Sequence, residues 1–265
     1  MRQMNIGTYY PIASYIHKLD ARVKVIAVVM VIVLLFFSSS FWSYGLIACF
    51  LLGLFLSARL PLRLLNGIRA MRFILILTFL FSVFWAQGDR VLFEWRWIYA
   101  TAEGVHAGIV LIVRVVLMLL VTTILTLTTT PFSLTNALEF LLSPLQKLRL
   151  PVSEGALMIN LALRFVPTII DEKDRIINSQ KARGASFEAD GIFKKAVSMI
   201  PVLIPLIISS FKRADDLALA IEARCFKIGA PRSSYRIMQM TSKDYKALLI
   251  ISLFFVSMIA FEIFL

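Results

Sequence analysis

Two stretches of this chain end in the same way, and each ending places an arginine where it could bind another protein. DRIINSQKARGA (residues 174–185) and DDLALAIEARCF (215–226) both begin at an aspartate and close on Ala-Arg followed by a small residue. The two arginines are Arg183 and Arg224. A guanidinium presents five N–H donors in a planar fork, which can satisfy several carboxylates or carbonyls of a partner at once.

Helical geometry leaves two interpretations of these endings open. Residues seven apart nearly eclipse on a helix, so Arg183 lies above Ile176 and Arg224 above Leu217, each at the edge of an apolar stripe. Under one interpretation the arginines are plugs that dock into grooves on another protein. Under the other, each arginine only meets the negative end of the helix dipole, an effect of about 0.3–1 kcal/mol.

The composition indicates an integral membrane protein. Of the 265 residues 59% are hydrophobic, whereas soluble domains contain about 45–50%. The 28 basic residues outnumber the 16 acidic ones. In a soluble protein this excess would suggest nucleic-acid binding, but in a membrane protein it fits the positive-inside rule, so no nucleic-acid partner is expected.

Five apolar runs approach the length of about 20 residues that a transmembrane helix needs. They are Val23–Ser39, Phe41–Ala58, Phe73–Ala86, Ala107–Thr130 and Ala247–Leu265. The expected fold is an all-α integral membrane protein with about five transmembrane helices and a cytoplasmic region of amphipathic helices. The predicted parts are residues 1–130 with four spans, the cytoplasmic region 131–246, and the last span 247–265.

Charge asymmetry predicts the orientation of these spans. The link between the second and third runs holds Arg59, Arg63, Arg69 and Arg72, whereas the link between the first two holds no charge. The N-terminus and residues 131–246 are therefore expected in the cytoplasm, and the C-terminus on the far side of the membrane.

The run AVSMIPVLIPLIISS (196–210) is apolar but has basic pairs at both ends. We interpret it as a kinked helix near the membrane surface, with a sixth or seventh span as the alternative. The helix is expected to start near Gly191, pass Pro201 and Pro205, and reach Arg224, with Gly229 as its stop. The preceding helix is expected to bend near Pro167 and to end at a left-handed Gly184.

Three segments resemble the transmembrane T component of energy-coupling factor (ECF) transporters. They are SYIHKLDARVK (14–24), LRFVPTIIDEKDRIINSQKARGA (163–185) and KRADDLALAIEARCF (212–226). The resemblance implies a non-catalytic scaffold that holds a membrane-embedded substrate-binding S component and two cytoplasmic ABC-type ATPases, for uptake of a vitamin or metal ion. ATP and Mg²⁺ would bind to the ATPases, and this chain would bind no cofactor or metal of its own.

The same resemblance assigns candidate residues. The two docking motifs are Ala182-Arg183-Gly184 and Ala223-Arg224-Cys225. Cys225 departs from the usual glycine, so the second helix is expected to continue towards Gly229. An adaptable apolar surface would face the S component; the alternatives are ordinary packing within the region and contact with lipid headgroups. The prolines at 167, 201 and 205 would act as hinges, or those at 201 and 205 would only mark where the helix turns along the membrane. The surface residues are Leu157, Met158, Leu161, Met199, Val202, Leu203, Ile204 and Leu206.

Two other functions fit the sequence less well. A self-sufficient transporter predicts ionisable or broken spans near mid-bilayer, and these runs show almost none beyond Arg114, which could snorkel or pair with another subunit. An enzyme is poorly supported, because no GxxxxGK[ST], HExxH or GxSxG motif occurs.

The remaining polar residues near the membrane have simpler interpretations. His17 and His106 are expected on opposite sides of the membrane, so they would not share a metal. Asp20, Arg22 and Lys24 could form a local salt-bridge network or simply anchor the N-terminal segment at the membrane face.

Overall fold

The computed structural model describes residues 9–12, 14–60, 71–85, 91–95, 98–148, 150–185, 187, 191–227 and 240–264. The chain divides into two compact units, Met1–Ala137 with Ile237–Leu265, and Leu138–Arg236. Arg63, Arg69 and the predicted stop at Gly229 lie outside the described residues.

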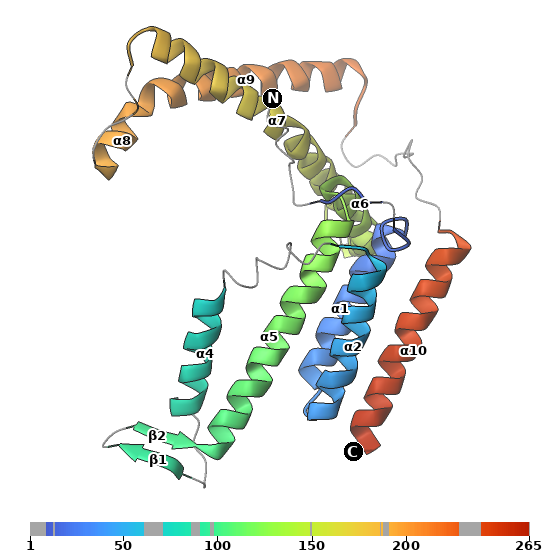
Figure 1. Ribbon diagram of the computed structural model, residues 1–265. Coiled ribbons are helices and arrows are strands. Elements are labelled where there is room, and N and C mark those ends of the chain that lie inside the picture. Colours follow the sequence, from blue (N-terminus) through green and yellow to red (C-terminus); the bar gives the residue numbers. More distant parts are fainter. Residues whose placement is uncertain are drawn as a thin grey trace. The chain divides into compact units, whose positions relative to one another are not determined.

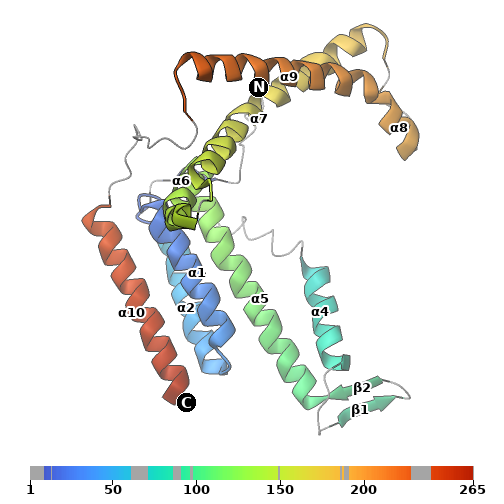
Figure 2. The ribbon, with the colours of Figure 1, turned by 180° about the vertical axis from the view of Figure 1, so that it is seen from behind.

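The first unit is a bundle of apolar helices. Its helices are α1 (Ala21–Phe37), α2 (Phe41–Ser57), α4 (Arg72–Trp85), α5 (Ala102–Thr128) and α10 (Ser242–Phe264). In Figures 1 and 2, α1, α2, α5 and α10 lie side by side. Leu35, Ile47 and Leu51 are completely buried in the shared core, so apolar side chains hold the bundle together.

Helix lengths confirm an all-α integral membrane protein. Both α5 and α10 are long and apolar enough to cross a bilayer, while α2 and α4 are shorter apolar helices. Helix α5 begins at Ala102 and helix α10 at Ser242. Each helix begins before its predicted apolar run, because the polar residues that precede the run are helical too.

A short hairpin between α4 and α5 is the exception to the helical pattern, and the sequence analysis missed it. Strands β1 (Val91–Trp95) and β2 (Ile98–Thr101) pair antiparallel. The Thr101 side chain then accepts a hydrogen bond from the Gly104 N–H at 3.1 Å and caps α5. The hairpin therefore leads directly into the start of that helix.

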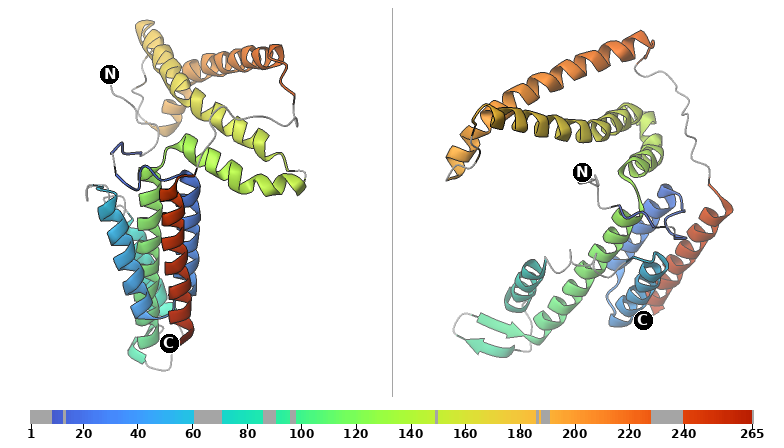
Figure 3. Two further views of the ribbon diagram at one scale, coloured as in Figure 1. Left: turned by 90° about the vertical axis from the view of Figure 1, so that its right-hand side faces the viewer. Right: turned by 45° about the horizontal axis from the view of Figure 1, so that its top comes forward.

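The second unit contains the long helices that carry the two arginine endings. Helix α6 (Pro131–Leu142) runs into it from the first unit, and the 3₁₀ helix η2 (Ser143–Leu148) follows. Then come α7 (Val152–Ala182), α8 (Ile192–Ser198) and α9 (Ile200–Ala223). Figure 3 shows α7 as a curved helix that crosses α9. Pro167 lies inside α7 and accounts for a bend, because it lacks the N–H of the helical ladder.

The expectation of one helix from Gly191 to Arg224 is wrong. The helix breaks at Met199 into α8 and α9. Pro201 has no N–H, and inside a helix its ring would clash with the carbonyl four residues earlier, so it sits in the first turn of α9 instead. Pro205 remains inside α9.

By length and hydropathy α7 also qualifies as a membrane span. The sequence analysis had placed it outside the bilayer. Its apolar half includes Glu154, Asn160 and Arg164, and five charged residues follow without interruption at 171–175. Such groups would need polar partners in hydrocarbon, so length alone does not place this helix in the membrane.

Candidate docking site

The tip of α7 closes in a complete Schellman motif. Gly184 has a φ of +86°, and its N–H donates to the Lys181 carbonyl at 3.0 Å. The Ala185 N–H donates to the Gln180 carbonyl, also at 3.0 Å. These two bonds satisfy carbonyls that the helix end would otherwise leave open, and glycine takes the left-handed conformation without a Cβ penalty. The predicted cap at Gly184 is confirmed.

The tip of α9 closes in the same motif. Cys225 has a φ of +56°, and its N–H donates to the Glu222 carbonyl at 2.8 Å. The Phe226 N–H donates to the Ile221 carbonyl at 3.3 Å. Since the cap residue Arg224 has a φ of −88° and Arg183 one of −86°, the two endings share one backbone geometry.

The expected extension of the second helix towards Gly229 is therefore wrong, because α9 ends at Ala223. A left-handed cysteine costs about 1 kcal/mol relative to glycine, and the two capping hydrogen bonds offset that cost. The departure from Ala-Arg-Gly changes the residue type and leaves the shape of the tip intact.

Both tips are open to a partner. All six residues of the two endings are exposed: Ala182, Arg183, Gly184, Ala223, Arg224 and Cys225. Within the part of the chain that the structure describes, neither arginine side chain forms a hydrogen bond or an ion pair. Each guanidinium therefore keeps its donors available.

The predicted apolar surface is mostly accessible. Met158 is 69% exposed, Leu203 50% and Ile204 54%, whereas Leu157, Leu161 and Leu206 are partly exposed and Met199 is exposed. Val202 is 3% exposed, so this residue packs within the chain and is not part of an open surface. Val202 lies in the first turn of α9, directly after the break at Met199.

One ion pair joins α7 to α9, and the sequence analysis missed it. The Arg213 Nη2 donates to the Glu172 Oε2 at 3.1 Å. The two residues carry opposite charges, and each lies two residues before the start of its repeated stretch, which is the sequence signal that could have revealed them.

Arg114 finds its partners inside the bundle. Its Nη2 donates to the Tyr44 hydroxyl at 2.7 Å and to the Ser38 carbonyl at 3.2 Å. The Tyr44 hydroxyl in turn donates to the Ser38 carbonyl at 2.6 Å. These contacts tie α5 to the turn between α1 and α2, which gives Arg114 a structural role.

Glu262 holds the same turn from α10, and the sequence analysis did not single it out for this. Its Oε1 accepts from the Ser39 N–H at 2.7 Å and from the Ser40 N–H at 3.2 Å. It also accepts from the Ser39 hydroxyl, and its Oε2 from the Ser43 hydroxyl, both at 2.5 Å. One carboxylate thus satisfies donors of a turn that carries no charge of its own.

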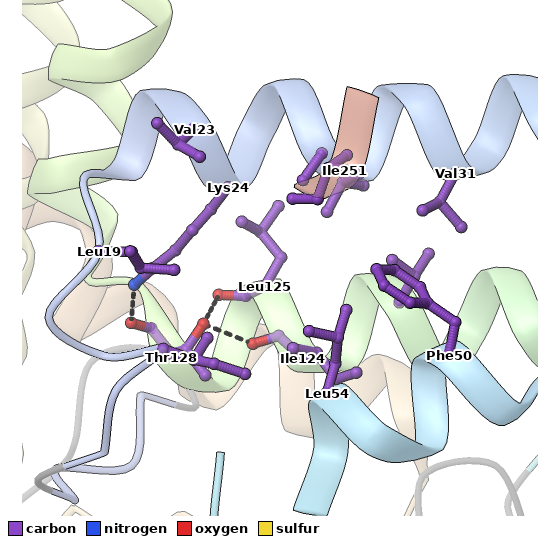
Figure 4. Close-up of a pocket in the computed structure, with 14 residues that line it drawn as sticks. Leu19, Val23, Lys24, Val31, Phe50, Leu54, Ile124, Leu125, Thr128 and Ile251 are labelled. Carbon is purple, nitrogen blue, oxygen red and sulfur yellow. Dashed lines mark hydrogen bonds between the residues drawn. The ribbon is translucent and has the colours of Figure 1, made fainter. Parts of the chain in front are cut away.

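Of the two interpretations of Asp20, Arg22 and Lys24, the structure favours anchoring, because Asp20 and Lys24 form no ion pair with each other in the described part of the chain. Asp20 instead caps α1 by accepting from the Arg22 N–H at 2.9 Å. The buried Lys24 ammonium donates to the Thr128 carbonyl at 2.9 Å, as Figure 4 shows, and to the His17 carbonyl at 3.4 Å. The ammonium is therefore held by one carbonyl at the end of α5 and one in the segment before α1.

Figure 4 also shows a cavity beside Lys24, lined by α1, α2, α5 and α10. It measures about 70 Å³, and its walls are apolar apart from Lys24 and Thr128. In the described ranges no three His, Cys, Asp or Glu side chains gather where a metal could bind. The described part of the bundle thus offers packing and anchoring, while the two arginine tips are exposed.

These features define a class: a helical membrane protein whose chemistry is suited to holding partners. A family model described as "Cobalt transport protein" (CbiQ) matches residues 13–235. The curated "Energy-coupling factor transporter transmembrane protein EcfT" of Streptococcus equi subsp. equi is 41% identical over 252 residues, 95% of this chain and 94% of that protein. The protein of the same description from Bacillus subtilis is 37% identical over 245 residues, 92% of each chain.

The chain therefore belongs to the family of energy-coupling factor transporter transmembrane proteins. The expected family is confirmed over nearly the whole chain. Its role is that of a non-catalytic membrane component of a transporter.

Proposed function

We propose that this chain couples two cytoplasmic ABC-type ATPases to a membrane-embedded S component, and that each ATPase docks on one arginine tip. The observation that carries the proposal is the shared geometry of the tips. Arg183 and Arg224 are caps of identical Schellman motifs, both exposed and both with free donors in the described structure. Two arginine tips of the same geometry suit similar grooves on two related ATPases.

The S component would pack on the apolar surface of α7 to α9. That surface comprises Leu157, Met158, Leu161, Met199, Leu203, Ile204 and Leu206, without the buried Val202. Unbranched methionines adapt to partners that change position. The interruptions at Pro167, Pro201 and Pro205 would act as hinges, and ATP and Mg²⁺ would bind to the ATPases. The S component would then decide which vitamin or metal ion is imported.

The orientation belongs to the same proposal. The chain would cross a prokaryotic plasma membrane several times, with the N-terminus and the unit Leu138–Arg236 in the cytoplasm. The charged residues 171–175 support a place for α7 outside the hydrocarbon. So do the basic residues that flank the run 196–210.

Substrate uptake by the whole transporter in lipid vesicles tests the docking function. Removing one buried interfacial charge costs on the order of 2–5 kcal/mol, so Arg183→Ala and Arg224→Ala should each reduce assembly or uptake severely, and the double variant should abolish it. The matched control is Lys181→Ala, because Lys181 also lies in the last turn of α7 and meets the same helix dipole. Near-normal uptake by the control would confirm docking over a dipole effect.

Three results would contradict the proposal. Normal uptake by the double variant would show that the tips hold no ATPase. Equal losses for Lys181→Ala and Arg183→Ala would reduce both residues to stabilisers of a helix end. Binding of a small solute by the chain alone would favour a self-sufficient transporter instead.

A further inference from the structure

The ion pair between Glu172 and Arg213 joins α7 and α9 at matching positions, two residues before each of the repeated stretches. The paired residues are 41 positions apart. Arg183 and Arg224 are separated by the same offset. A contact between residues at equivalent positions is what a local two-fold relation between two helices produces. Here the equivalent residues have opposite charges, so they attract each other across the crossing.

The distance from this pair to each arginine tip is the same along both helices. Glu172 lies eleven residues before Arg183, and Arg213 lies eleven residues before Arg224. At 1.5 Å of rise per residue each arm is roughly 16 Å long. Eleven residues are close to three helical turns, so on each helix the paired side chain and the tip arginine share one face.

Both arms are unbroken helix. The segments 172–182 and 213–223 contain neither proline nor glycine and are helical throughout. The two internal prolines, Pro167 and Pro205, lie on the other side of the ion pair. Bending at the prolines therefore leaves the arms from the pair to the tips straight.

We propose that Glu172 and Arg213 are positioning residues that fix where α7 and α9 cross, so that the two arginine tips stand on arms of equal length. The pair is partly exposed, at 26% and 37% of the two side chains, and such pairs contribute little to overall stability. The pair instead determines where along their lengths α7 and α9 contact each other, because a like-charged pair at this place would push the helices apart. The consequence for the ATPases rests on the proposed docking function, whereas the crossing itself does not.

Pulsed electron spin resonance on the full-length chain in lipid nanodiscs tests the crossing without any partner. Spin labels at Lys181→Cys and Glu222→Cys, both exposed and at equivalent positions, report the distance between the tips. Cys49→Ser and Cys225→Gly remove the native thiols. Glu172→Arg and Arg213→Glu should each shift and broaden the distance distribution, and the double charge swap should restore it. Lys173→Ala, which breaks an ion pair within α7 alone, should change nothing.

Unchanged distributions in both single reversals would overturn the proposal, as would a double swap that stays as broad as the single variants. Capture of the two ATPases by the same variants separates this idea from the docking function. Reversals that alter the distances but not the capture, while Arg183→Ala loses one ATPase, would overturn the claim that the crossing sets the docking geometry. Undiminished capture by Arg183→Ala would contradict the docking function and leave the distance test valid.

Discussion

Cys225 shows how little of a helix end is determined by residue type alone. Glycine at 184 and cysteine at 225 adopt the same left-handed conformation and make the same two backbone hydrogen bonds. From sequence, cysteine argues against this geometry, because a Cβ disfavours a positive φ. Two features favour the left-handed conformation instead. One is the pair of capping hydrogen bonds, and the other is the apolar character of Ile221 and Phe226, which one of these bonds joins.

We predict that Cys225→Gly stabilises the tip of α9 by about 1 kcal/mol, because glycine removes the left-handed strain. The reverse change, Gly184→Ala, should destabilise the tip of α7 by a similar amount. A Cβ at 184 would meet no atom within 4 Å, so strain and not collision is the cause. Amide hydrogen exchange of residues 222–226 and 181–185 measures both effects. Lower protection of the α9 tip in Cys225→Gly would contradict this explanation.

At the scale of elements, two helices far apart in sequence hold the turn between α1 and α2. Arg114 comes from α5 and Glu262 from α10, and each binds a different part of residues 38–44. The turn itself has no charge. The cation on α5 and the anion on α10 therefore fix how α5 and α10 are positioned along the bundle axis relative to the turn between α1 and α2.

Glu262→Ala should lower the stability of the bundle by about 1–3 kcal/mol, because it leaves two backbone N–H groups and two hydroxyls without their acceptor. Glu262→Gln should cost less, since its amide oxygen still accepts. Thermal unfolding in mild detergent measures both variants, and Glu103→Gln, at an exposed site in the first turn of α5, is the control. A melting temperature of Glu262→Ala equal to that of the control would refute this role.

The sequence predicted the elements whose cause is local and missed those whose cause is distant. Apolar runs predicted the bundle helices, and Gly184 predicted the end of α7. The break at Met199 was not predicted, because a proline can either kink a helix or begin a new one, and the sequence around Pro201 and Pro205 does not distinguish these outcomes. The partners of Arg114, Lys24 and Glu262 could not be predicted, because they depend on which helices pack together.

At the scale of the whole molecule, the division of the chain into two units matches a division of tasks. The unit Met1–Ala137 with Ile237–Leu265 has an apolar core and internally satisfied charges at its turns. The unit Leu138–Arg236 has few buried side chains and a large exposed apolar and charged surface. A surface of that kind is expected where partner proteins cover it in the assembly.

Native mass spectrometry of the tagged chain, purified from its own host in mild detergent, tests the central claim most directly. The wild-type chain should carry two ABC-type ATPases and one small membrane protein. Arg183→Ala and Arg224→Ala should each lose one ATPase, and the double variant should lose both while it keeps its fold. Two ATPases retained on the double variant, or a wild-type chain that purifies alone, would contradict the account.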